Sequence, residues 1–154
     1  AHPKVGVGYN AQVAVDAKGW IVVAWDDNAA GKTQIWVKRW NGKTWEALGP
    51  GPIISGNPGW SVRPSLALDG GGNPVVAWQD GMLGEHEIYV KRWDGRAWVE
   101  LGPESAQGGG VSRTAAGSYH VSVTADSRGR VWLAWEEDPN NGEILADAPE
   151  RVRV

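Results

Sequence analysis

Two copies of one aromatic hairpin hold the residues best suited to ligand chemistry. Residues 35–50 read IWVKRWNGKTWEALGP, and residues 88–103 read IYVKRWDGRAWVELGP, which is 53 positions further along. An indole face packs well on the C–H face of a pyranose, and an arginine binds a carboxylate with two parallel hydrogen bonds. The candidate sugar-binding residues are therefore Trp40, Trp45, Trp93, Trp98, Arg39, Arg92, Asp27 and Asp80.

Each of these residues also has a purely structural interpretation. The tryptophan pairs can equally pack between neighbouring units of the fold, while lysine stems cover indole rings and each arginine pairs with an acid. Asp27, Asp80 and Glu137 end apolar runs at equivalent places, where they can accept sugar hydroxyls or serve as loop acids. The tryptophans inside those runs are expected to be core residues, namely Trp25, Trp78 and Trp135.

Other chemistries lack their characteristic residues. The sequence contains no cysteine, which excludes disulfides and thiolate metal sites. No Gly-x-Ser-x-Gly motif marks a serine nucleophile, no carboxylate pair is singled out for glycoside hydrolysis, and no loop has the alternating acids of a calcium site. A single histidine, His86 between two glutamates, is weak support for a metal site. We therefore expect no catalytic residue, no metal and no cofactor, and predict a protein that is not an enzyme.

The hairpins belong to a unit that recurs three times. An Asp-x-x-Gly motif followed by Ala-Trp begins at Asp16, Asp69 and Asp126. Asp and Gly suit a tight turn, because the carboxylate bonds nearby backbone N–H groups and glycine accepts a positive φ. We place the repeats in one domain, 1–154, at about residues 9–61, 62–118 and 119–154.

Each unit predicts up to four strands and no helix. We expect first strands at 11–15, 65–68 and 121–125, second strands at 20–25, 74–78 and 131–135, third strands at 35–40 and 88–93, and fourth strands around Trp45 and Trp98. The second strands are apolar on both faces, which predicts that every sheet is covered on both sides. Asn41-Gly42 and Asp94-Gly95 predict tight hairpin turns between the third and fourth strands.

The third unit departs from this pattern near its end. After residue 145 the chain reads ADAPERVRV, without a Trp-Asn/Asp-Gly turn. The chain could turn at Pro149 and return beside its own sheet, or this alternating tail could leave the body and pair with another chain. The candidate self-association residues are therefore Arg151, Val152, Arg153 and Val154.

Composition narrows the class of partner and the location. A net charge of −3 with scattered basic residues argues against nucleic acid as a partner, and every apolar run is too short to span a membrane. The 11 Trp, 22 Gly and 9 Pro, with no Phe, favour many short strands joined by tight turns. The chain begins Ala1-His2-Pro3 without an initiator methionine, which indicates either a removed signal peptide or a cut fragment. We favour the first and expect export and an extracellular or cell-surface location.

Repeated four-stranded sheets with apolar faces are typical of β-propeller blades. Three blades do not close a ring, and an open arc would leave an apolar face bare at each end, at an expense of about 10 kcal/mol. We therefore expect an all-β, propeller-like chain of three four-stranded antiparallel blades that is completed by self-association. Two copies would form a six-bladed ring if the contact closes, and a filament if it does not.

The Trp-Asn/Asp-Gly-x-x-Trp hairpins at 40–45 and 93–98 resemble those of the small fucose-binding lectins. That resemblance implies six-bladed propellers assembled from short chains, with Trp40, Trp45, Trp93 and Trp98 lining sugar sites between blades. The run Gly42-Lys43-Thr44-Trp45 is similar to the Asp-box of sialidase-type propellers, with Trp40 at the aspartate position.

Three functions follow in order of preference. The first is a secreted, non-enzymatic, lectin-like module that binds carbohydrate at repeated sites, since several weak sites on one body give avidity. The second is a self-polymerising extracellular subunit joined through its end blades and its C-terminal strand. The third is a fragment of a sialidase-like propeller. The expected partners are further copies of the chain and glycans, with no nucleic acid and no membrane span.

Overall fold

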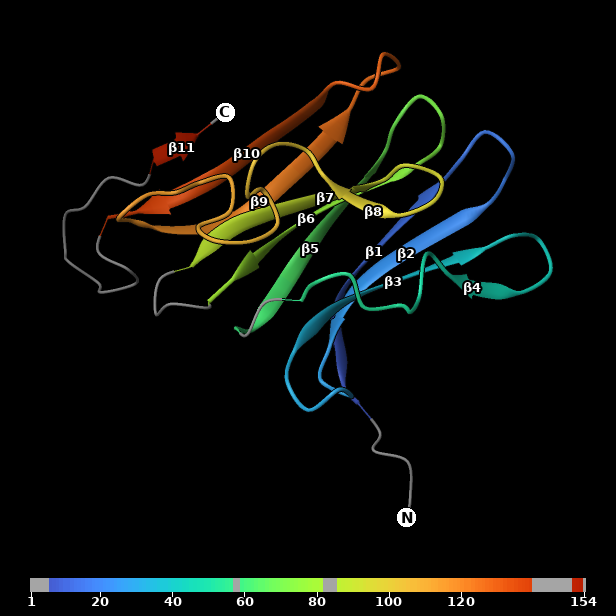
Figure 1. Ribbon diagram of the computed structural model, residues 1–154, viewed down its shortest axis with the longest axis horizontal. Coiled ribbons are helices and arrows are strands. Elements are labelled where there is room, and N and C mark those ends of the chain that lie inside the picture. The colour runs from blue at the N-terminus through green and yellow to red at the C-terminus, as the bar shows by residue number, and fades with distance from the viewer. Residues whose placement is uncertain (1–5, 57–58, 82–85, 140–150, 154) are drawn as a thin grey trace.

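The computed structural model describes residues 6–56, 59–81, 86–139 and 151–153, which form three antiparallel sheets (Figure 1). Sheet 1 has the order β1-β2-β3-β4 and sheet 2 the order β5-β6-β7-β8, while sheet 3 has the order β11-β10-β9. Their bounds are β1 Gly8–Val15, β2 Ile21–Asp27, β3 Gln34–Trp40, β4 Trp45–Ala47, β5 Ser61–Leu68, β6 Pro74–Asp80, β7 Glu87–Trp93, β8 Trp98–Glu100, β9 Gly117–Ala125, β10 Val131–Asp138 and β11 Arg151–Arg153. The expectation of an all-β chain with three antiparallel sheets is confirmed.

The predicted turns form through the expected side-chain contacts. Asp16 Oδ1 accepts hydrogen bonds from the backbone N–H groups of Lys18 (2.8 Å) and Trp20 (2.9 Å), and Asp69 and Asp126 do the same in their sheets. Gly19 closes the first of these turns with a φ of 78°. These local contacts fix the register between the first two strands of each sheet, and hence which side chains share a face.

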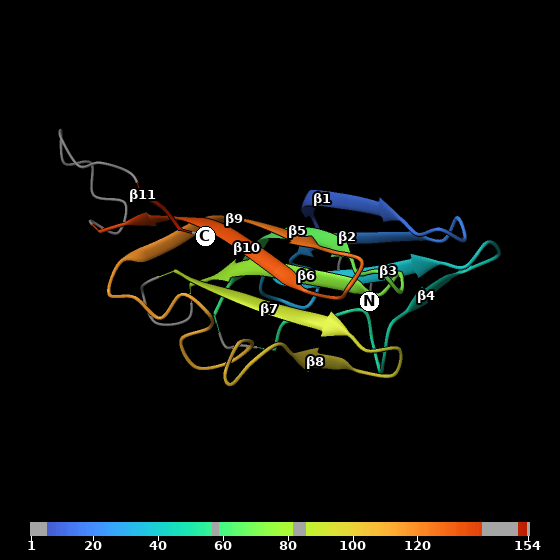
Figure 2. The same cartoon turned by 90° about the horizontal axis from the view of Figure 1, so that it is seen from above.

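The three sheets stack on one another through two apolar cores. Strand β5 lies between β1 and β9, so the first strands of the sheets gather along one side of the molecule, with β7 and β8 toward the other (Figure 2). The first core joins sheet 1 to sheet 2 and contains Val22, Val37, Trp78 and Tyr89. The second core joins sheet 2 to sheet 3 and includes Val90.

Among the described residues, the middle sheet alone is covered on both faces. Every residue of β6 is buried, whereas burial alternates along β2, and β10 is largely half-buried. Within one chain the outer two sheets each have a neighbouring sheet on one side only, so covering of their other faces remains a prediction that depends on self-association. The expected bare apolar face is present on sheet 1, where Val13 and Val15 are 69% and 60% exposed.

Sheet 3 has three strands in the described part of the chain, where four were expected. The strand β11 pairs antiparallel with β10, with Arg151 opposite Glu137 and Val152 opposite Glu136. The backbone thus returns beside its own sheet, which is the first of the two alternatives for the tail. Residues 140–150 and Val154 lie outside the described residues. No helix in the described ranges is long and apolar enough to cross a bilayer.

Candidate functional site

The first strands of the three sheets share a backbone irregularity at one end. Asn10 in β1, Arg63 in β5 and His120 in β9 occupy equivalent positions and have φ values of 51°, 52° and 51°. The register of each strand shifts beside this residue, as in a β-bulge. A left-handed conformation is unfavourable for non-glycine residues, and its repetition in three sheets marks this end as a candidate site.

Each bulge residue lies beside a polar residue near the end of the second strand. These second residues are Asp26 in β2, Gln79 in β6 and Glu136 in β10. We call the six residues the bulge row: Asn10, Asp26, Arg63, Gln79, His120 and Glu136.

Hydrogen bonds link the bulge row from one sheet to the next. Asp26 Oδ1 accepts from Asn10 Nδ2 (2.9 Å) within sheet 1 and from the backbone N–H of Arg63 (3.1 Å) in sheet 2. Gln79 Oε1 of sheet 2 accepts in the same way from the backbone N–H of His120 (3.2 Å) in sheet 3. The row therefore joins the second strand of one sheet to the first strand of the next. Because the donor is a backbone N–H group, the side chain of each bulge residue can differ.

At the sheet 3 end of the row, three side chains contact one another in series. The guanidinium of Arg63 contacts His120 Nε2, and His120 Nδ1 lies 2.7 Å from Glu136 Oε2. Arginine can only donate, so Nε2 accepts and Nδ1 carries the proton that it donates to Glu136. The His120 and Glu136 side chains are 51% and 45% exposed, so these donors and acceptors face solvent.

A buried polar tier lies directly beneath the row. The carboxylate of Asp80 is fully buried, and its Oδ2 accepts a hydrogen bond from Ser61 Oγ (2.5 Å). In the described part of the chain, Asp80 Oδ1 and Ser118 Oγ have no hydrogen-bond partner. Burial lowers the pKa of His86, and the nearby Asp80 carboxylate opposes that shift. The His86 ring lies 4.9 Å from the Tyr119 ring between centroids, in a tilted arrangement, and burial raises the pKa of Tyr119.

Asp27 and Asp80 were both predicted to bind ligand; Asp80 belongs to this tier, whereas Asp27 is half-buried at the equivalent position of sheet 1. Asp27 Oδ1 accepts from the backbone N–H of Ala29 (2.7 Å), and its Oδ2 accepts from Trp25 Nε1 (3.2 Å). Asp27 is thus held in a loop turn, as the structural interpretation expected, whereas Asp80 is withdrawn from solvent. Neither carboxylate lies beside the tryptophan hairpins.

The two tryptophan hairpins have the same internal geometry and different surroundings. Trp40 and Trp45 are 5.8 Å apart between ring centroids, and so are Trp93 and Trp98. Trp45 is 50% exposed on the outer face of sheet 1, whereas Trp93 is 7% exposed. The first hairpin is therefore the more exposed of the two, and Trp98 in the second hairpin is half-buried.

The second hairpin packs against sheet 1. Trp98 Nε1 donates to the carbonyl of Leu48 (2.9 Å), and the Lys91 ammonium donates to the carbonyl of Ile54 (2.8 Å). Burial also lowers the pKa of Lys91, with Glu100 opposing this in part. At this hairpin the alternative of packing between units is the one that the structure contains.

The first hairpin borders a shallow groove of about 400 Å³ on the outer face of sheet 1. It is lined by Val23, Trp25, Lys38 and Trp45. Trp25 stacks on Trp36 with 6.1 Å between centroids, which extends the aromatic surface. The groove is mainly apolar, and Lys38 is the only charged residue among those lining it.

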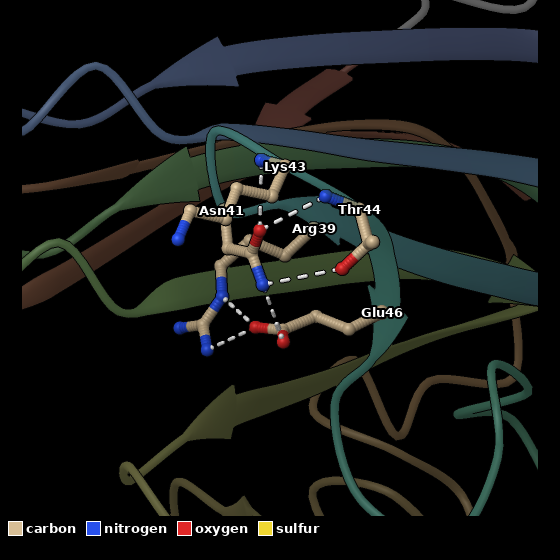
Figure 3. Close-up of polar contacts among 5 residues, drawn as sticks. All are labelled: Arg39, Asn41, Lys43, Thr44 and Glu46. Carbon is tan, nitrogen blue, oxygen red and sulfur yellow. Dashed lines mark hydrogen bonds and ion pairs between the residues drawn. The ribbon is translucent and has the colours of Figure 1, made fainter.

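Arg39 is engaged inside its own sheet rather than offered to a ligand. Its Nε and Nη2 atoms donate to Glu46 Oε1 (2.9 and 2.6 Å) (Figure 3). Its guanidinium also lies 4.7 Å from the centroid of the Trp20 ring. Asn41 joins this network through Glu46 Oε2 (3.1 Å), and the Arg39 hydrogen bond lowers the pKa of Glu46. Arg92 occupies the equivalent position in sheet 2, where Val99 replaces the acid opposite it.

Sequence reasoning missed the bulge row. Asp27 and Asp80 were singled out, but the residue just before each of them carries the inter-sheet hydrogen bond. Aligning the three units would have shown polar residues at 10, 63 and 120 and again at 26, 79 and 136. No group of three or more His, Asp or Glu residues within the described ranges is arranged to hold a metal ion.

Comparison with known proteins gives distant structural likenesses, one of which is described here. No protein-family model matches the chain, and no curated protein matches it. A crystal structure from Bacteroides thetaiotaomicron, titled a "putative glycosidase", superposes with a TM-score of 0.49 at 15% identity. The likeness covers 89% of this chain and 49% of that one, so the chain spans about half its length.

Proposed function

We propose that the protein is a non-enzymatic carbohydrate-binding module of propeller-like architecture that binds sugar hydroxyls at the bulge row. The observation that carries this proposal is the left-handed backbone at Asn10, Arg63 and His120. Strained non-glycine residues persist where the surrounding structure holds them, and they cluster at functional sites. The proposal retains the expected secreted, extracellular setting.

The chemistry of the row suits hydroxyl groups. A sugar hydroxyl both donates and accepts, so it needs donors and acceptors side by side. Asn10 and Arg63 are exposed and supply donors, and the half-exposed Glu136 supplies a carboxylate acceptor. Asp26 is buried, so it holds Asn10 and Arg63 in place rather than facing the sugar.

The same contacts favour binding over catalysis. Both ring nitrogens of His120 are engaged, Nε2 by Arg63 and Nδ1 by Glu136. An imidazole held in this way has no free lone pair with which to abstract a proton. Its role in the proposal is to orient Arg63 and Glu136.

A glycan array, followed by calorimetry on the best ligand, tests the proposal. Replacing Arg63 or His120 by Asn preserves the left-handed backbone, because Asn10 already occupies it in sheet 1. We expect Arg63→Asn to lose at least about tenfold in affinity, as one charge-assisted hydrogen bond to the sugar is removed. His120→Asn should also weaken binding, because Arg63 and Glu136 lose the side chain that orients them. Trp45→Ala is the matched control and should bind normally. Binding lost in Trp45→Ala and kept in Arg63→Asn would instead locate the sugar at the hairpin.

A second candidate function is a self-assembling structural subunit. One observation favours it, namely that Trp93 and Trp98 pack between sheets while the equivalent Trp40 and Trp45 face outward. Because the second hairpin packs on a neighbouring sheet, the equivalent first hairpin is suited to pack on a sheet of another chain.

A further inference from the structure

In the described part of the chain, two sheet faces lie uncovered at opposite ends of the stack. The outer face of sheet 1 carries Val13, Val23 and Trp25, and Val13 is 69% exposed. The outer face of sheet 3 carries Thr124 and Trp132, which lie opposite each other across β9 and β10, and Trp132 is 53% exposed. Large exposed apolar residues gathered on one face mark an interaction surface.

Each uncovered face has a covered counterpart inside the same chain. One repeat further along, Leu66, Val76 and Trp78 hold the positions of Val13, Val23 and Trp25, and they pack against sheet 1. The residues that cover them include Val22 and Ala24 of β2. In sheet 3 those two positions are Trp132 and Ala134, on its outer face. The contact between sheets 1 and 2 therefore shows how a face like the outer face of sheet 1 packs against a face like the outer face of sheet 3.

The free face is already shaped like the covered one. Trp25 and Trp36 stack with centroids 6.1 Å apart, as Trp78 and Tyr89 do inside the first core. No rearrangement of these rings is needed for docking, which keeps the entropic expense of association low.

The series of hydrogen bonds between sheets in the bulge row ends at sheet 3. Asp26 accepts the backbone N–H of Arg63, and Gln79 accepts that of His120. Glu136 of sheet 3 is equivalent to the acceptors Asp26 and Gln79. Asn10 of sheet 1 is equivalent to Arg63 and His120, so its backbone N–H is the corresponding donor at the other end of the stack. Likewise Ser65 Oγ accepts the backbone N–H of Val123 (3.0 Å), a bond that Ser122 would repeat toward Val13.

We infer that the outer face of sheet 1 binds the outer face of sheet 3 of a second copy, head to tail, and that Glu136 accepts the backbone N–H of Asn10 across this contact. The inference deepens the proposed function, because the bulge row then continues from His120 and Glu136 into Asn10 and Asp26 of the next copy. A heterologous contact closes into a ring or grows as a filament.

Light scattering on the full 154-residue chain tests the contact. Val13→Glu disables the sheet 1 face and Trp132→Glu disables the sheet 3 face, while Trp60→Glu, 70% exposed in a loop, is the control. We expect wild type and control to run at two chain masses or more, and each face variant at one. An equimolar mixture of the two face variants should recover a two-chain species, because each supplies the face that the other lacks.

Several outcomes would overturn the inference. A wild-type mass of one chain at the highest soluble concentration removes the contact altogether. A Val13→Glu variant at one chain mass, with Trp132→Glu still at the wild-type mass, would mean that the sheet 1 face pairs with itself. A mixture that contains only single chains would exclude the head-to-tail arrangement.

Glu136 provides a sharper test of the geometry. Glu136→Gln should keep the association constant within about twofold, since Gln79 performs the same role inside the chain, and Glu136→Ala should weaken it by about tenfold. Equal constants for the two variants would reject the predicted bond. Arg63→Asn should leave the mass unchanged, because it removes a sugar contact and not a contact between chains. Sugar binding by a monomeric Val13→Glu variant would show that the proposed function holds without the contact between chains.

Discussion

Trp78 and Trp25 occupy the same place in successive repeats, and replacing each by alanine should have very different effects. Trp78 is fully buried between sheets 1 and 2, and stacks at 6.1 Å on Tyr89. Trp25 stacks at the same distance on Trp36, but its outer side lines the open groove. The pair therefore isolates the effect of a covering sheet on one side chain.

The magnitudes follow from what each ring contacts. Removing a buried tryptophan costs about 3–5 kcal/mol of unfolding free energy. The unpaired Nε1 of Trp78 reduces that loss slightly, because a buried donor without a partner is itself unfavourable. Trp25→Ala removes an aromatic pair of about 1 kcal/mol and one hydrogen bond to Asp27 of about 1 kcal/mol. We expect Trp78→Ala to be the more destabilising by about 2 kcal/mol.

Urea unfolding followed by circular dichroism measures the difference. The protein should be dilute, so that association does not cover the sheet 1 face and stabilise it by mass action. For a chain of this size about 2 kcal/mol corresponds to roughly 4–8 °C in melting temperature, which gives a second readout. Equal destabilisation by the two substitutions would refute the reasoning, because it would mean that sheet 1 is covered in the monomer. A Trp25→Ala effect that grows with protein concentration would add support for the head-to-tail contact.

Three further predictions concern single contacts. Ser61→Ala should lower the unfolding free energy by about 1–3 kcal/mol in chemical denaturation, because it leaves the buried Asp80 carboxylate without its hydrogen bond. Trp98→Phe should lower the unfolding free energy by about 1 kcal/mol, because the hydrogen bond from its indole N–H to a carbonyl is lost. Trp45→Phe on the exposed hairpin should leave the unfolding free energy unchanged, and similar losses for the two variants would contradict the assigned burial. Burial lowers the folded-state pKa of His86 below 6.5, so the unfolded chain binds the proton first and stability falls as pH drops through 6.5. His86→Gln should flatten that part of a melting-temperature profile against pH, and an unchanged slope would count against this role.

The sheets and their turns could be predicted from the sequence because their causes are local. The carboxylate of Asp16 bonds backbone N–H groups two and four residues away, so the turn is specified within five residues. Gly42, with a φ of 93°, similarly specifies the turn at Asn41. Strand ends were less accurate: β2 runs to Asp27 and β5 begins at Ser61, since pairing with a neighbouring strand extends an element beyond its apolar run.

The covering of each face could not be predicted, because it depends on position in the stack. The runs WIVVAW at 20–25 and PVVAW at 74–78 are nearly the same, yet β6 is wholly buried and β2 is buried on one face. Periodicity reports which side chains share a face, and it carries no information about what lies opposite that face. For the same reason the sequence could not separate the exposed Trp45 from its packed counterpart Trp98.

The tryptophan hairpins and the bulge row recur in different ways. The hairpin tryptophans recur in sequence, and in sheet 2 they pack on the neighbouring sheet. The proposed contacts to different sugar hydroxyls require different donors and acceptors. The bulge positions meet that requirement: their left-handed backbone repeats, while their side chains change from Asn10 to Arg63 to His120. In a repeat protein of this kind, the residues that vary on an invariant backbone are better candidates for binding than the residues that repeat.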